Sequence, residues 1–138
     1  LFDAIAELAT SCLADFSPQQ LSNTVWAFAV AAHPSPALFH AIAEVATSRL
    51  TEFNPQGIAN TVWAFATAGR ASPALFDAIA EVAKSRLEDF NPQELSNVVW
   101  GFATAKHVSP SLFDATAEIS KSRLKDFNPQ SLSNQVWA

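Results

Sequence analysis

The sequence predicts an all-α protein, a right-handed α-solenoid built from helix-turn-helix repeats of 37 residues. Alignment of the chain with itself gives a fixed period of 37, and periods of 20 to 50 residues are typical of stacked repeats. Only 3 of the 138 residues are Gly and 49% are hydrophobic, which favours helix and an ordered core. The clearest marker of the period is tryptophan, at Trp26, Trp63, Trp100 and Trp137.

Each unit is predicted to contain two helices that begin at a capping residue followed by Pro. A Ser or Asn N-cap with Pro at the first helical position is a strong helix start. The first helices of the units begin at Ser35-Pro36, Ser72-Pro73 and Ser109-Pro110. The second helices begin at Ser17-Pro18, Asn54-Pro55, Asn91-Pro92 and Asn128-Pro129. Apolar residues then recur every three or four positions in both helices, as in Leu95, Val99 and Phe102.

The repeats form a single array over residues 1–138, with about 3.7 units at roughly 1–34, 35–71, 72–108 and 109–138. The first unit lacks the Ser-Pro start, and the last stops within its second helix. Neither end has the polar character of a capping repeat, and the chain contains no Met. We therefore expect this chain to be an interior slice of a longer solenoid.

Composition and charge exclude several classes of function. The formal net charge is −5, whereas nucleic-acid binders usually carry a basic surface, so bulk charge argues against RNA for this segment alone. No apolar run is long enough to insert into a membrane. Cys12 is the one cysteine and has no evident His partner, and no metal-ligand spacing or Gly-rich phosphate loop is present. We expect no enzyme activity, no cofactor and no metal.

An Asn and a Trp recur three residues apart in the second helix of every unit, although Asn is unfavourable within helices. These rows are Asn23, Asn60, Asn97 and Asn134 with Trp26, Trp63, Trp100 and Trp137. The interpretation we favour is structural: Trp fills a groove between units, and a buried Asn bonds to a neighbouring backbone group. The alternative is that Trp stacks on bases and Asn contacts base edges.

A surface that distinguishes one base or partner residue from another must lie at positions where the repeat units differ. On the second helix these positions are four residues apart and share one stripe. The stripe consists of Gln20, Gly57, Glu94 and Ser131 with Thr24, Thr61, Val98 and Gln135. Its amides and hydroxyls suit base edges, so we predict it to bind RNA or a partner. The variable stripe of the first helix is largely acidic and is interpreted as a solvated face.

Basic residues recur at two places. Arg49, Arg86 and Arg123 lie near the end of the first helix, and we favour a structural role for them, in pairs with Glu52 or Asp89. The turn after the second helix carries His33, Arg70, Lys106 and His107. These four either cap the helix or form a track for RNA phosphates, and both interpretations stay open.

The run "FNPQELSNVVWGFATA" (90–105), which follows the amphipathic helix "PALFDAIAEVAKSRL", resembles the octotricopeptide repeat and the related heptatricopeptide-like repeats. The resemblance covers essentially the whole chain and is closest from Pro55 to Gly69. It implies an organellar protein, in a chloroplast or mitochondrion, that binds single-stranded RNA and acts in transcript maturation, stability or translation. The competing hypothesis is a scaffolding solenoid that contacts other protein subunits in an organellar ribosome or photosynthetic complex. The resemblance favours RNA.

Overall fold

The computed structural model describes residues 2–33 and 35–123, and this part of the chain is all-α, as predicted. Within these residues there are seven α-helices, three short 3₁₀ helices and no strand. The elements are α1 (Phe2–Cys12), η1 (Leu13–Asp15), α2 (Pro18–Val30), α3 (Pro36–Thr47), η2 (Leu50–Glu52), α4 (Pro55–Thr67), α5 (Pro73–Ser85), η3 (Leu87–Asp89), α6 (Pro92–Thr104) and α7 (Pro110–Ser122). The helix start predicted at Asn128 and the last Asn–Trp pair lie outside the described residues.

The predicted helix starts are confirmed from α2 to α7, because local capping bonds form where the sequence indicates. Asn54 Oδ1 accepts a hydrogen bond from the backbone N–H of Gly57 at 2.7 Å, and Ser72 Oγ accepts one from Leu75 at 3.4 Å. Ser109 differs, since its side chain makes no capping bond although α7 still begins at Pro110. The 3₁₀ turns between paired helices were not predicted.

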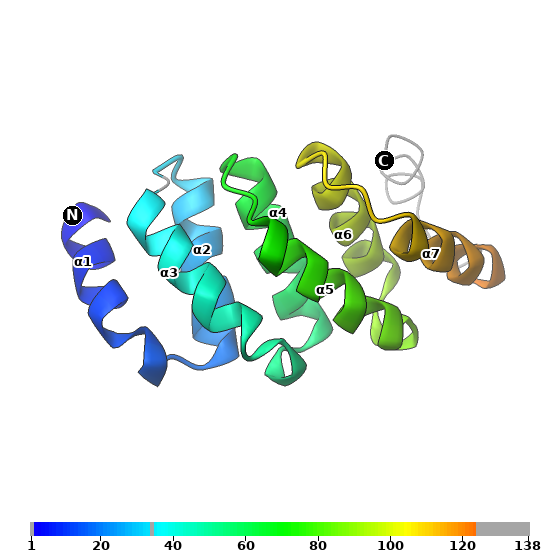
Figure 1. Cartoon of the computed structure of the whole chain (residues 1–138), viewed down its shortest axis with the longest axis horizontal. Helices are drawn as coiled ribbons and strands as arrows, with labels where there is room; N and C mark the ends of the chain where they lie inside the picture. The colour runs from blue at the N-terminus through cyan, green and yellow to red at the C-terminus, as the bar shows by residue number, and fades with distance from the viewer. Residues whose placement is uncertain (1, 34, 124–138) are drawn as a thin grey trace.

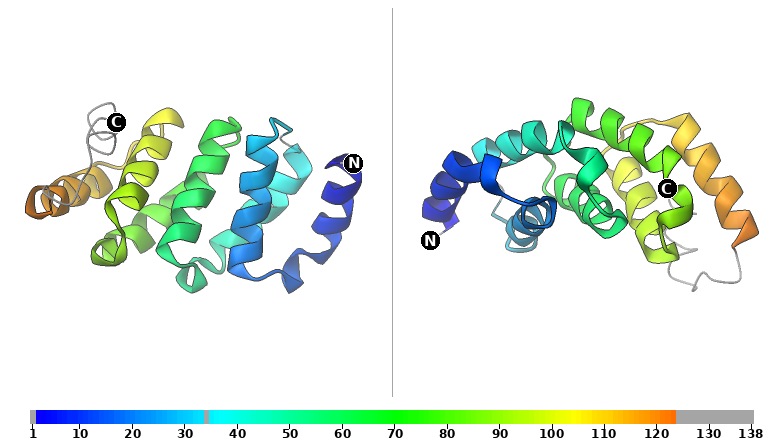
Figure 2. Two further views of the ribbon diagram at one scale, coloured as in Figure 1. Left: turned by 180° about the vertical axis from the view of Figure 1, so that it is seen from behind. Right: turned by 90° about the horizontal axis from the view of Figure 1, so that it is seen from below.

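The helices form two layers (Figure 1). The outer layer consists of α1, α3, α5 and α7, each in contact with the next along the layer, and the inner layer consists of α2, α4 and α6. The layers follow a gentle arc, with the outer layer on its outside and the inner layer on its inside, as the view from below in Figure 2 shows. The core lies between them, where Phe39 and Phe65 meet edge to face at 5.1 Å and Phe76 contacts Phe102 at 4.9 Å. That these two layers belong to a right-handed solenoid of 37-residue repeats stays a prediction.

Small residues let the inner helices approach closely. A Cβ added to Gly101 of α6 would lie 2.3 Å from Val62 Cγ1 of α4, and Ala64 of α4 is completely buried. Such a spacing admits only Gly at position 101 without movement of its neighbour. Close contact on the inside of the arc fits the curvature of the two layers.

Three arginines connect successive units through backbone carbonyls. Arg49, Arg86 and Arg123 each donate a 2.7 Å hydrogen bond from Nη1 to the carbonyl oxygen of the Phe 33 residues earlier, at Phe16, Phe53 and Phe90. Arg49 also pairs with Glu52 at 3.3 Å, and Arg86 lies 3.9 Å from Asp89. The structural interpretation of these arginines is confirmed, and the carbonyl is the partner that the sequence did not predict.

Candidate nucleic-acid interface

The side of each inner helix that faces away from the outer layer carries the same three residue types. Gln, Asn and Trp lie at positions i, i+4 and i+7, which places them on one helix face roughly opposite the buried stripe of Leu21, Val25 and Phe28 in α2. We call these nine residues the indole–amide face: Gln19, Asn23, Trp26, Gln56, Asn60, Trp63, Gln93, Asn97 and Trp100. The three helices that carry it form the inner side of the arc (Figure 2).

The tryptophans of this face are only partly covered. Trp26 is 44% exposed, and Trp63 and Trp100 are half-buried. The ring centroids of Trp26 and Trp63 lie 6.4 Å apart with an interplanar angle of 36°, so the indoles of the first two units lie next to each other. Trp63 also packs against the core, which agrees in part with the structural role predicted for this row.

The structural interpretation of the asparagines needs correction. Asn23 is exposed and Asn60 and Asn97 are half-buried, so none is the buried residue that was expected. Among the described residues, the one recorded side-chain hydrogen bond of the row joins Gln93 Nε2 to Asn97 Oδ1 at 3.0 Å. A helix in a two-layer stack has neighbours below it and on both sides, which leaves the side opposite the core open.

The glutamines were missed as candidate site residues. Gln19, Gln56 and Gln93 are all exposed and stand beside the asparagines at the start of the inner helices. The signal was present in the sequence, because Pro-Gln recurs with the same period of 37 as the Trp row. The Pro of each pair was interpreted as a helix start, and the Gln after it was given no role.

The variable stripe is a packing seam in α4 and α6 and not an open surface. Thr61 is 1% exposed and donates a hydrogen bond from Oγ1 to the carbonyl of Gly57 at 2.7 Å, and Val98 is 2% exposed. A Cβ on Gly57 would lie 3.6 Å from Ser22 Oγ of α2, so the stripe faces the preceding inner helix. Burial therefore removes Gly57, Thr61 and Val98 from the accessible surface. Thr24 is half-buried, and Ser131 and Gln135 lie outside the described residues.

Two further members of that stripe form helix caps. The backbone N–H of Ser17 donates to Gln20 Oε1 at 2.8 Å, and the backbone N–H of Gln20 donates to Ser17 Oγ at 3.1 Å. Asn91 and Glu94 form the same reciprocal pair at 2.9 and 2.7 Å. These capping boxes engage the side chains that were predicted to read a ligand.

The basic residues of the turns divide into two groups. His33 Nε2 lies 2.9 Å from Asp3 Oδ1, and His107 Nε2 lies 2.7 Å from Asp77 Oδ1. Arg70 and Lys106 are exposed and have no ion pair recorded within residues 2–33 and 35–123. A phosphate track along this edge would therefore depend on Arg70 and Lys106.

Comparison with known families adds a decisive observation. The family model described as RNA-editing substrate-binding complex 6 protein matches residues 1–138. The chain belongs to this family. The resemblance to octotricopeptide and heptatricopeptide-like repeats was therefore wrong, because the Asn and Trp motif that carried it also occurs in this different family. No curated protein matches the chain.

In this member of the RNA-editing substrate-binding complex 6 family, charge is divided between the layers. The one charged residue of α2, α4 and α6 is Glu94, so the indole–amide face is neutral. The outer helices are acidic, with two lysines, Lys84 and Lys121, beside exposed carboxylates at Asp3, Glu7, Glu44, Asp77, Glu81, Asp114 and Glu118. Within the described residues no group of three possible metal ligands gathers, and no helix has the length and apolar character of a membrane span.

Proposed function

We propose that this chain is a non-enzymatic subunit of an RNA-editing substrate-binding complex, and that its indole–amide face binds single-stranded RNA. The observation that carries the proposal is the row of partly exposed indoles and amides on the inside of the arc, in a chain of this family. We further propose that the described helices belong to a right-handed α-solenoid of 37-residue units, whose period is in the sequence.

The chemistry of the face suits bases better than phosphates. Every base has a flat face that stacks on an indole, and alanine substitution of such a platform costs about 1–3 kcal/mol per base. The amides of Asn and Gln both donate and accept hydrogen bonds, as base edges do. Because the same residues return in each unit, such contacts grip a strand without distinguishing its sequence.

The family membership also bears on location. Membership of an RNA-editing complex family supports a location in an organelle, and we propose that this organelle is the mitochondrion. Nothing supports a chloroplast, so the photosynthetic assembly is withdrawn as an alternative. The proposed substrate is accordingly an RNA that undergoes editing.

A second candidate function is that of a protein scaffold within the same complex. It is favoured by the charge distribution, because the inner face is neutral and the outer face is acidic. RNA affinity normally depends on cations that displace counterions from phosphates. A neutral face of amides and indoles could equally bind an extended polypeptide, with RNA held by other subunits.

Binding of a fluorescently labelled, unstructured RNA to the purified chain, measured by anisotropy, tests the proposal. Trp63→Ala is expected to weaken binding about fivefold to a hundredfold through lost stacking. Gln56→Ala combined with Asn60→Ala is expected to weaken it without altering the fold, since neither side chain has a recorded hydrogen bond in the described part. Thr51→Ala, an exposed change in η2, is the matched control. No binding at low salt would reject the RNA proposal in favour of the scaffold.

A further inference from the structure

The edge of the array contains an acid–base pair that recurs in the first and third units. His33 pairs with Asp3, and His107 pairs with Asp77, each His standing 30 residues after its Asp. In both units the His closes the turn after an inner helix, and the Asp lies at the start of the outer helix of the same unit. The pair joins the two layers at this edge.

The second unit breaks this rule at both positions. Arg70 stands where the other units have His, and His40 stands where they have Asp. This unit therefore has two basic side chains at the positions where the first and third units have an Asp–His pair. His40 Nε2 instead lies 3.1 Å from Glu44 Oε1, one turn further along α3. Arg70 is exposed, with no ion pair recorded in the described part of the chain.

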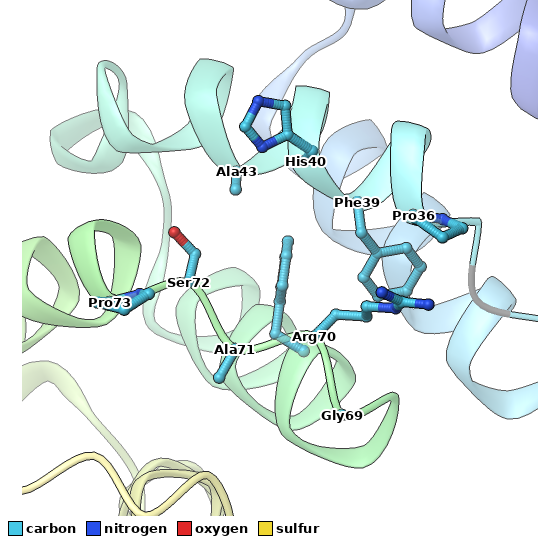
Figure 3. A pocket seen from close by; sticks show the side chains of 10 residues that line it. Pro36, Phe39, His40, Ala43, Gly69, Arg70, Ala71, Ser72 and Pro73 are labelled. Carbon is cyan, nitrogen blue, oxygen red and sulfur yellow. The ribbon is translucent and has the colours of Figure 1, made fainter.

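A pocket of about 390 Å³ occupies the place of the lost pair. Figure 3 shows His40 on one side of it, from α3, and Arg70 on the other side, from the turn after α4. Among the described residues no carboxylate lines the pocket, and Ser72 and Pro73, at the N-terminal end of α5, belong to its lining. A guanidinium with no ion pair in the described part of the chain, in a pocket without a described carboxylate, is a group suited to an anion.

We propose that this pocket binds a phosphate group of single-stranded RNA, with the guanidinium of Arg70 as its main contact. The inference rests on the proposed function: if the bases bind the neutral indole–amide face, the phosphates must be neutralised by cations outside that face. Arg70 follows Trp63 by seven residues and lies in the turn directly after the same inner helix, α4. A guanidinium matches a phosphate through two parallel hydrogen bonds.

The repeat supplies a variant that removes the pocket while keeping a pair the fold already uses. His40→Asp with Arg70→His recreates in the second unit the bridge of the first and third, so the protein is expected to fold. The reciprocal change, Asp77→His with His107→Arg, is expected to create a second pocket in the third unit. Both start from the full chain, and circular dichroism confirms that each remains helical.

Inorganic phosphate is the first probe, titrated while amide and imidazole NMR signals are recorded. Signals of Arg70, His40 and the turn before α5 are expected to shift together. Affinity should fall at least about tenfold in the His40→Asp/Arg70→His protein, because a charge-assisted contact is lost. The reciprocal variant should show a second set of shifts around positions 77 and 107. Shifts spread evenly over all lysines and arginines, or none, would overturn the inference.

RNA probes distinguish the two sources of a phosphate. A short oligouridylate with a 5′-phosphate and the same oligomer with a 5′-hydroxyl should bind equally if a backbone phosphate enters the pocket, and the first more tightly if a terminal phosphate does. Tighter binding of an acidic peptide than of either oligomer would overturn the assignment to RNA. Gln56→Ala/Asn60→Ala should weaken the oligomers and leave inorganic phosphate unaffected. If the unaltered chain binds inorganic phosphate at this pocket but binds neither oligomer, the proposed function fails while the phosphate site stands.

Discussion

Nη1 of Arg86 donates a 2.7 Å hydrogen bond to the backbone carbonyl of Phe53 in the preceding unit. Arg49 and Arg123 make the same contact with Phe16 and Phe90. Phe53 is almost completely buried, and the Arg86 side chain is 26% exposed, so little water competes for this bond. These arginines are therefore structural contacts between units, although Arg in an RNA-associated family would ordinarily suggest a phosphate ligand.

Arg86→Met is expected to destabilise the chain by about 1–3 kcal/mol, because it leaves the Phe53 carbonyl without its charged donor. Urea denaturation followed by circular dichroism measures the change. Lys121→Met is the control, since the Lys121 side chain is 76% exposed and its ion pair in the described part of the chain is with the exposed Glu118, so its effect should stay within about 0.5 kcal/mol. Equal effects of the two variants would contradict a structural role for Arg86.

Gly101→Ala is expected to destabilise the chain by about 1–3 kcal/mol, although Ala is the better helix former. The new Cβ would lie 2.3 Å from Val62 Cγ1. Val62→Ala removes that methyl group. Gly101→Ala should therefore cost less stability in the Val62→Ala background than in the unaltered chain. Additive effects of the two changes, measured in a double-mutant cycle by urea denaturation, would show that the helices do not approach as described.

Each of the three inner helices is followed by a residue with left-handed backbone geometry at the equivalent position. These residues are Ala32, Gly69 and Lys106, with φ of 54°, 68° and 57°. The following backbone N–H reaches back to a Phe carbonyl in each case, a Schellman closure. Ala32→Gly is expected to stabilise the chain by about 0.5–1 kcal/mol, and Gly69→Ala to destabilise it by a similar amount. Thermal unfolding midpoints measure both. Shifts of the same sign for the two changes would argue against left-handed geometry at these positions.

RNA binding is expected to depend only weakly on salt. Each phosphate contact on a single strand contributes a slope of about −0.7 to a plot of log K against log salt. If Arg70 and Lys106 are the contacts, the slope should be no steeper than about −1.4. Anisotropy titrations across a salt series give the slope. A value several times steeper would mean that phosphates contact cations beyond these two, and would reject base stacking as the main source of affinity.

Local features of the fold could be predicted from the sequence, because caps act within a few residues. The starts of α4 and α6 follow from Asn54-Pro55 and Asn91-Pro92, and the core stripe from Leu95, Val99 and Phe102. Nothing in these signals says which neighbours a helix has. At 100° per residue, Trp100 and Asn97 fall on the side of α6 opposite this stripe, but the expectation that Asn97 is buried there against another unit was wrong, since Asn97 is half-buried.

The candidate site was harder to predict because variation and function were assumed to coincide. Positions 61 and 98 differ between units, yet both are buried, since each fits the particular inner helix beside it. The surface that is open repeats the same Gln, Asn and Trp in each described unit. The exception in the second unit, Arg70 with His40, was visible only after the structure had paired the equivalent residues of the other units.

The contact between Arg86 and Phe53 has a consequence for how such a gene can change. Donor and acceptor always come from adjacent units and always stand 33 residues apart. A tandem duplication of a unit that carries this Arg reproduces the bond at the new junction, whereas an insertion or deletion of part of a unit between Phe and Arg changes their spacing. Recombination can therefore lengthen the array one such unit at a time, and each added unit carries the donor for its own junction.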